Sequence, residues 1–387
     1  MRKTASLPTC SGTGTNAVVG DPTDIAASSS SAALSGYEND VCDPSAVIAG
    51  GDYNTISSGN GSAGGSFIGS GGSNTITGAS TDTVIGGGST NAISGTANYS
   101  VIVGGENNTM TGGSSVITGG YKNTIAAPYA FLGSGSSNQI AASASQSVLV
   151  GGDGNTLNAQ YGALVGGLDN VVSGEGAYIA AGGYNTASGE GAVVDGGFNQ
   201  TASGAFATVP GGYANDAVGT YSFAAGARAS AQQTGTFVWS DGSDGDAYLT
   251  SARAYQFLAR ASGGFTLYTN AGSTVGAQLS AGSGTWASLS DRRAKTNIVP
   301  LDDAAVLDKV AALPISRWSY RTEHGVRHVG PMAQDFYAAF RVGEDDRHIT
   351  SIDEDGVALA AIKALNAEVT RQRAEIRRLT ARLDALR

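Results

Sequence analysis

The sequence is poor in cysteine and in long apolar runs, and each scarcity excludes a class of protein. Only Cys10 and Cys42 occur among 387 residues, so neither a disulfide scaffold nor a cysteine metal cluster fits, and whether the two pair is left open. No apolar stretch reaches the roughly 18 residues of a membrane-spanning helix. The basic start MRK lacks the apolar run of a signal peptide, so ordinary secretion is not expected.

Charge is also scarce until about residue 288. Residues 1–287 hold 6 Lys and Arg against 17 Asp and Glu, whereas residues 288–387 hold 16 against 15. Of the 58 glycines, 54 lie in the first part, so the two parts are physically different domains. The excess of acidic residues disfavours binding to the phosphates of a nucleic acid, because those need basic side chains, so we expect no nucleic-acid partner. Nothing in the composition indicates a cofactor or a metal.

The glycine-rich part contains a repeat. Segments such as VIAGGDYNTI (47–56), VIVGGENNTM (101–110) and VLVGGDGNTL (148–157) share two apolar residues, Gly-Gly and then Asn. This Asn recurs mostly every 15 residues, and Gln200 takes its place once. We call the series the Asn column. A short fixed period predicts a mainly β protein whose body is a parallel β-roll or solenoid of about twelve coils. We expect Gly-Gly to supply a turn with positive φ and the Asn to favour the same corner.

Most coils carry two adjacent apolar residues, as in Val47–Ile48 and Val101–Ile102. Neighbouring strand residues point to opposite faces, so one fills the coil and the other lies outside it. A continuous apolar stripe on a surface usually marks an interface. We therefore infer lateral packing against copies of the same chain. The alternative is a flattened two-layer roll with both faces internal.

Residues 235–287 combine aromatic residues with alternation and predict a neck of antiparallel strands. Asp241, Asp244 and Asp246 lie there in a Gly/Ser loop, but the EF-hand glutamate is missing, so a solvated turn is favoured over calcium.

The residues of the coils also bear on two further activities. A glycosidase needs two carboxylates about 5–10 Å apart, whereas the acids here are scattered singly. A threonine column follows the Asn column, as on some ice-binding solenoids, but it is interrupted, and a solvated strand edge fits better. The acids include Asp52, Glu106, Asp153, Asp169 and Asp195, and the threonines are Thr55, Thr75, Thr109, Thr124, Thr156 and Thr186.

Charge and a candidate nucleophile arrive together in SLSDRRAKTN (288–297), where Ser290 lies five residues before Lys295. A serine nucleophile needs a base, and lysine serves only when neutral, which requires shielding from water. No Gly-x-Ser-x-Gly elbow surrounds the serine. On spacing alone, Ser290 and Asp291 capping a turn before a charged strand is the simpler interpretation.

The end of the chain carries four heptads, which predict a coiled coil over residues 358–387. β-Branched residues at a with leucine at d favour dimers, and Gln372 is either a register device or a tolerated polar defect. The a positions are Ile362, Val369, Ile376 and Leu383, and the d positions are Leu365, Gln372, Leu379 and Leu386.

Three motifs in this part, SDRRAKTNI (290–298), GVRHVGPMAQDF (325–336) and SIDEDGVALAAIKALNAEV (351–369), resemble the intramolecular chaperone auto-processing domain of endosialidase tailspikes and phage tail fibres. The resemblance implies a homotrimer in which a serine–lysine pair, Ser290 and Lys295, cuts the Leu289–Ser290 bond after assembly. Members often have leucine where this chain has Ala294. The coils resemble the heads of trimeric autotransporter adhesins and the shafts of phage tail fibres.

These patterns predict four regions: an N-terminal segment for attachment or partly disordered (1–44), the coils (45–234), the neck (235–287) and a small α+β chaperone domain (288–387). We expect a trimeric tail-fibre or tailspike-like protein of a phage virion whose chaperone domain directs folding and then cleaves itself. A bacterial surface adhesin is the alternative, and a glycan-degrading tailspike fits less well. Expected partners are copies of the chain and a cell-surface glycan or another host receptor, without membrane insertion.

Overall fold

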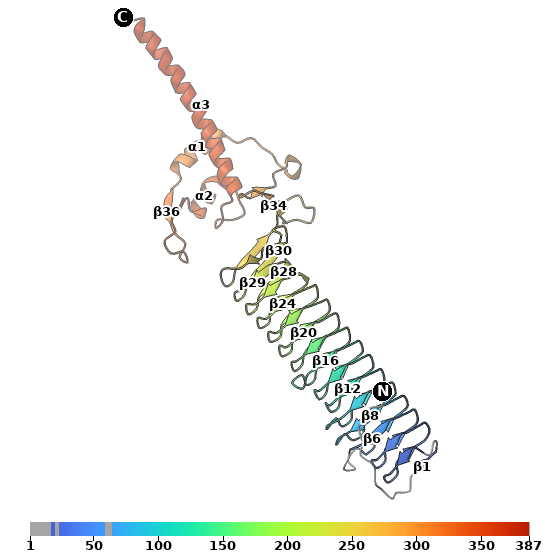
Figure 1. Ribbon diagram of the computed structural model, residues 1–387. Helices are drawn as coiled ribbons and strands as arrows, with labels where there is room; N and C mark the ends of the chain where they lie inside the picture. The colour runs from blue at the N-terminus through green and yellow to red at the C-terminus, as the bar shows by residue number, and fades with distance from the viewer. Residues whose placement is uncertain (1–16, 20–22, 59–63, 387) are drawn as a thin grey trace. The chain divides into compact units, whose positions relative to one another are not determined.

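The chain folds into two compact units that divide after Ser262. The structure, a computed structural model, describes residues 17–19, 23–58 and 64–386, so Cys10 lies outside the described residues. The first unit is a parallel β-solenoid of stacked coils (Figure 1). No described helix has both the length and the apolarity needed to cross a membrane.

Each coil of the solenoid contributes one short strand to each of two parallel sheets. The 17-stranded sheet, here sheet A, contains β1 (Ala17–Val18), β3 (Ala32–Ala33), β5 (Val47–Ile48), β7 (Phe67–Ile68), β9 (Val84–Ile85), β11 (Val101–Ile102), β13 (Val116–Ile117), β15 (Phe131–Leu132), β17 (Val148–Leu149), β19 (Ala163–Leu164), β21 (Tyr178–Ile179), β23 (Val193–Val194), β25 (Thr208–Val209), β26 (Gly212–Tyr213), β28 (Phe223–Ala227), β30 (Phe237–Asp241) and β32 (Phe257–Arg260). The 15-stranded sheet, here sheet B, contains β2 (Ile25–Ala26), β4 (Asp40–Val41), β6 (Thr55–Ser57), β8 (Thr75–Thr77), β10 (Ala92–Ile93), β12 (Thr109–Met110), β14 (Thr124–Ile125), β16 (Gln139–Ile140), β18 (Thr156–Leu157), β20 (Val171–Val172), β22 (Thr186–Ala187), β24 (Thr201–Ala202), β27 (Asp216–Ala217), β29 (Ala229–Ala231) and β31 (Leu249–Thr250).

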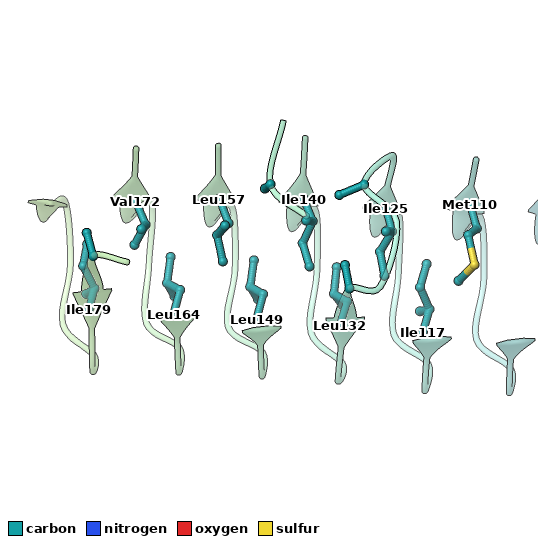
Figure 2. Close-up of a cluster of buried hydrophobic side chains, with 14 of the residues drawn as sticks. Met110, Ile117, Ile125, Leu132, Ile140, Leu149, Leu157, Leu164, Val172 and Ile179 are labelled. Carbon is teal, nitrogen blue, oxygen red and sulfur yellow. The ribbon is translucent and has the colours of Figure 1, made fainter. Parts of the chain in front are cut away.

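The core is a double row of aliphatic side chains, one from each strand, that meet between the two sheets (Figure 2). In β15, Leu132 is fully buried while Phe131 lies outward and is 37% exposed. The same order holds in β13, where Ile117 is buried and Val116 is half-buried. Each buried leucine or isoleucine stabilises the fold by about 1.5–3 kcal/mol. The prediction that one residue of each apolar pair fills the coil is confirmed.

Glycine is required at the corner after the sheet A strand in the regular coils. Gly105 has a φ of +92°, and a Cβ there would lie 2.3 Å from the carbonyl oxygen of Gly120 in the next coil. The predicted role of Asn at this corner is wrong. The residue before it adopts the left-handed conformation, as at Asn107 (φ 56°), and Asn108 itself is fully buried.

The buried Asn side chains form a continuous hydrogen-bonded column. The backbone N–H and Nδ2 of Asn155 both donate to Oδ1 of Asn138 in the preceding coil, each at 3.1 Å. The same Nδ2 donates to the carbonyl of Gly151 at 3.1 Å and to that of Gly167 in the next coil at 2.9 Å. Every lone pair and proton of the amide is therefore used without water, which is what a fully buried amide requires.

The solenoid extends beyond the predicted coils at both ends. β2 and β4 pair in parallel, so coils replace the expected separate segment over residues 23–44. β28, β30 and β32 also pair in parallel, which corrects the antiparallel neck over residues 237–260. The aromatic residues that suggested a neck stack between coils instead, with Phe237 4.7 Å from Phe223 and 4.6 Å from Phe257, centre to centre.

The second unit is α+β. An antiparallel sheet of β33 (Gly264–Tyr268), β34 (Gly276–Ser280) and β35 (Ala287–Ser288) comes first. The short helix η1 (Arg292–Ala294), α1 (Asp303–Ala312), the hairpin β36 (Ser316–Trp318) and β37 (His328–Gly330), α2 (Ala333–Phe340) and α3 (Ser351–Asp384) follow. Val306 of α1 packs against Ala360 and Ala361 of α3. Thr350 caps α3 by accepting from the Asp353 N–H at 3.2 Å.

Gln200 breaks the column and gives the first prediction. Its longer side chain still accepts from the Asn215 N–H through Oε1 at 2.8 Å, but its Nε2 is buried without a partner. The Gln200→Asn variant should place the amide where Asn185 has it, bonded to the next glycine carbonyl. Because an unpaired buried amide costs about 1–3 kcal/mol, the free energy of unfolding should rise by about 1 kcal/mol. Guanidinium unfolding would measure it.

The matched control is Asn170→Gln, which introduces the same break between two regular coils. This variant should lose a similar free energy. Equal stability of Gln200→Asn and the natural chain would contradict the assignment of the unpaired amide as a defect.

Candidate functional site

The predicted scissile bond lies directly after the edge strand of the antiparallel sheet. β35 pairs with β34, and the N–H of Leu289 extends the pairing by donating to the carbonyl of Gly276 at 3.0 Å. Leu289 is 37% exposed, and Ser290 is also exposed. The sheet thus fixes the chain up to the bond and leaves the following residues free to turn.

The structure brings the two predicted catalytic residues into contact. Nζ of Lys295 donates a hydrogen bond to Oγ of Ser290 at 2.6 Å. Both residues are exposed in the single chain. The spacing of five residues becomes a contact because a short 3₁₀ turn, η1, reverses the backbone between them.

Asp291 holds that turn. Its Oδ1 accepts from the Arg293 N–H at 2.8 Å, and its Oδ2 accepts from Nη2 of Arg293, also at 2.8 Å. The Arg293 side chain, followed by the Arg293 N–H, lowers the pKa of the Asp291 carboxyl. The predicted cap by Asp291 is therefore present, and it coexists with the Ser290–Lys295 contact. The role of Arg293 in holding this turn was not predicted from the sequence. An aspartate two residues before an arginine was the pattern that could have indicated it.

A shallow hollow adjoins the scissile bond. Ala294 lines it, so a larger side chain at this position would partly fill the space. Its lining is Ser273, Thr274, Leu289, Asp291, Arg293 and Ala294.

Two of the three histidines of the second unit, His328 and His348, contact carboxylates, and the hydrogen bond that the Ser290 side chain makes among the described residues is to Lys295. Nε2 of His328 contacts Oε2 of Glu323 at 2.9 Å, and Nδ1 of His348 contacts Oδ1 of Asp345 at 2.9 Å. Lys295 is therefore the basic side chain in contact with the serine.

The aspartate loop of residues 241–246 is pinned by arginine and backbone groups. Asp244 pairs with Arg260, and Asp246 pairs with Arg228 at 2.6 Å. The backbone N–H of Ser262 donates to Asp241 at 2.6 Å, and this bond and others from Ser262 and Ser243 hold the pKa of Asp241 well below its usual range. Nε of Arg260 also lies 3.9 Å from Oδ1 of Asp241, so Asp241 and Asp244 share one arginine while Asp246 pairs with another.

The remaining candidates lie on the outer surface of the coils. Asp52, Glu106 and Asp153 occupy one column, and successive acids are three coils apart, hence separated by about 14 Å, which is too far for a glycosidase pair. Asp153 and Asp169 lie on adjacent coils, joined by a backbone hydrogen bond of 2.9 Å. The threonine column forms the outer surface of sheet B, rather than a strand edge, with Thr109 and Thr156 half-buried.

The outer surface of sheet A is apolar. Val148 is 41% exposed, and Val103 and Val150 are still more open to solvent. Glycine follows the two outward phenylalanines of β7 and β15, as at Gly69 after Phe67, where a Cβ would lie 2.3 Å from the carbonyl oxygen of Gly86 in the next coil and 3.5 Å from Cε1 of Phe67. The outward positions of sheet A between residues 47 and 180 carry no charge. We call them the apolar stripe.

The heptad positions of α3 form a second unpaired apolar surface, here the heptad seam. Most of its members are exposed, Val369 is half-buried, and Nε2 of Gln372 donates to Glu368 at 2.7 Å. α3 begins at Ser351, a turn or two before the predicted coiled coil, because its first part packs on α1. The exposed members are Ile362, Leu365, Gln372, Ile376, Leu379, Leu383 and Leu386.

Comparison with known families identifies the segment that holds this site. Residues 290–342 match the family described as chaperone of endosialidase. The match begins at the serine that contacts Lys295. No curated protein matches the chain. The protein thus combines a β-solenoid with a C-terminal chaperone-of-endosialidase segment, the order found in tailspike-like and fibre-like proteins, and that family implies a self-cleaving intramolecular chaperone.

Proposed function

We propose that this chain is a homotrimeric, host-binding fibre of the tailspike or tail-fibre kind whose C-terminal unit directs assembly and then cuts itself off at Leu289–Ser290. The observation that carries the proposal is the 2.6 Å contact between Nζ of Lys295 and Oγ of Ser290, at the first residue of the chaperone segment. We call these two residues the dyad.

The dyad can perform the cleavage with atoms of this chain and one water. Neutral Lys295 accepts the Ser290 hydroxyl proton as Oγ bonds to the Leu289 carbonyl carbon. The C–N bond then breaks, and the proton passes to the leaving nitrogen of Ser290. This leaves an ester between Leu289 and the Ser290 side chain. Water hydrolyses the ester, giving a Leu289 carboxylate and a released piece that begins at Ser290.

Exposure of the dyad in the single chain explains why cleavage would wait for assembly. Water stabilises the charged form of a lysine, and burial disfavours it. Both members are exposed here, so the isolated chain is expected to be inactive. Packing of further chains around the junction would remove the water and activate the base.

Two apolar surfaces supply the contacts for that assembly. The apolar stripe runs along the solenoid and the heptad seam along α3, and both lack a partner among the described residues. The number three is what the resemblance of the chaperone segment implies, since β-branched a positions with leucine at d would by themselves favour two helices.

We propose a phage virion as the site of action, with a bacterial surface adhesin as the alternative. The two differ in where the mature solenoid is found, on particles or on cells. In either setting, the partner would be a cell-surface glycan or another host receptor.

The second prediction concerns the dyad. Ser290→Ala removes the nucleophile and Lys295→Ala removes the base, so both variants should remain uncut while still assembling. Lys295→Arg should also stay uncut, because a guanidinium does not lose its proton in proteins. The intact mass of the natural chain should show two pieces divided at Ser290. Efficient cutting of Lys295→Ala would disprove the mechanism, and a different cut position would disprove the residue assignment.

The third prediction concerns the heptad seam. Ile376→Asp combined with Leu379→Asp would bury like charges where helices meet, at a cost of several kcal/mol. The yield of soluble, processed solenoid should then collapse, although the solenoid itself is unchanged. The control is Ala374→Asp with Ala381→Asp, which adds the same charges at outward heptad positions. Normal yield from the seam variant would show that α3 is not a folding template.

The fourth prediction concerns the apolar stripe. The processed natural body should sediment as three chains. Val101→Asp with Val148→Asp places charges on the stripe and should abolish that species, because unpaired charges at an apolar interface are strongly destabilising. Thr109→Asp with Thr156→Asp, on the outer surface of sheet B, is the matched control and should stay trimeric. A folded, soluble monomer of the natural body would refute lateral packing.

A further inference from the structure

One corner of the solenoid presents aromatic rings at every second coil. The corner residues before β11, β13, β15, β17 and β19 are Tyr99, Ser114, Tyr129, Gln146 and Tyr161, all with φ between 55° and 59°. Backbone bonds align neighbouring corners, for example from the Tyr129 N–H to the carbonyl of Gly113 at 2.9 Å. Strands in a sheet lie about 4.8 Å apart, so the three rings repeat at about 9.6 Å. We call them the tyrosine ladder.

The chain's own folding does not account for these tyrosines. A bulky residue with positive φ is strained, and Gly or Asn would suit the corner better. Tyr99, Tyr129 and Tyr161 are 66%, 65% and 53% exposed, so their burial adds little stability. A side chain that strains the backbone and stays in solvent is expected to contact something outside the chain.

Alternation keeps the ring faces open. Further along the same corner, Phe206 and Tyr221 occupy adjacent coils and stack at 5.6 Å, so each covers a face of the other. In the ladder a serine and a glutamine separate the tyrosines, and no ring–ring contact joins the three. Open ring faces at a fixed repeat suit a ligand with flat apolar surfaces at the same repeat.

The ladder is uncharged between Tyr99 and Tyr161, and an acid flanks it at each end: Asp82 in the coil before Tyr99 and Glu175 in the coil after Tyr161. Asn98 and Gln160 precede Tyr99 and Tyr161, and Nε2 of Gln160 lies 3.4 Å from Oε1 of Gln146. Amides can donate to and accept from hydroxyl groups. No Lys or Arg occurs between residues 97 and 121, or between 123 and 227, so a polyanion lacks its counter-charge. Apolar ring faces with hydroxyls around them describe a neutral sugar chain.

We propose that the tyrosine ladder binds a linear, neutral polysaccharide by stacking every second sugar on a ring while the intervening amides bind its hydroxyls. This inference rests on the proposed host-binding function and assigns that function a place and a ligand class. The competing occupant is a second copy of the chain, because the ladder borders the apolar stripe.

The test is binding of the processed body to an array of neutral linear oligosaccharides, including chitohexaose and cellohexaose, followed by calorimetry on the strongest binder. Tyr129→Ala should weaken binding about tenfold, as expected for loss of one stacked aromatic contact. Tyr129→Phe should bind like the natural protein, because the ring face remains. Tyr184→Ala is the matched control: Tyr184 is a half-exposed corner tyrosine with a φ of 57° on a different column, and it should bind normally.

Three results would overturn the ladder as a polysaccharide site. They are no binding to any neutral glycan, unchanged binding by Tyr129→Ala, or loss of the trimer in Tyr129→Ala, which would assign the ladder to the interface between copies. None of them would disturb the proposed self-cleavage, because the intact-mass measurement on Ser290→Ala tests that separately.

Discussion

The buried asparagine column is the constraint on which the solenoid depends. Each amide is held by the coil before it and the coil after it, so a coil displaced by one residue would leave several buried polar groups unpaired. At about 1–3 kcal/mol for each unpaired group, a slip by one residue does not compete with the native register. The inward positions of isoleucine and leucine follow from this register, because a short strand fixes how many residues separate each of them from the asparagine. Outward positions are free to vary, and the surfaces that meet partners are built from them.

The same regularity creates a folding problem. A slip by one whole coil would keep asparagine against asparagine and isoleucine against isoleucine. The asparagine column therefore disfavours a displacement of one or a few residues, but it does not disfavour pairing of two chains that are displaced by a whole coil. In the proposed assembly of several chains, correct alignment would therefore need a starting point outside the repeat. A chaperone segment that joins the C-termini would supply one, because it raises the local concentration of the first coils to pair.

The period, the inward and outward alternation, the glycine corner and the terminal helix could all be predicted because each follows from local geometry at a fixed spacing. The position of the asparagine could not. A left-handed corner and a buried amide ladder both favour asparagine, and only the placement of Asn108 between two coils separates them. The parallel pairing of β30 and β32 was missed for a similar reason: stacked phenylalanines on successive coils give the same alternation as an antiparallel neck.

The junction shows what a short turn can and cannot achieve alone. Asp291 and Arg293 close η1, and that closure is sufficient to place Nζ of Lys295 against Oγ of Ser290. Proximity does not make the lysine a base while water surrounds it, since solvation favours its charged form. The contact between the two side chains is therefore encoded within one chain, whereas the shielding from water would come from neighbouring chains in the proposed assembly. A dyad that is positioned by one chain and shielded by others would cut only after several chains have assembled. At that stage the C-terminal unit would no longer be needed to direct folding.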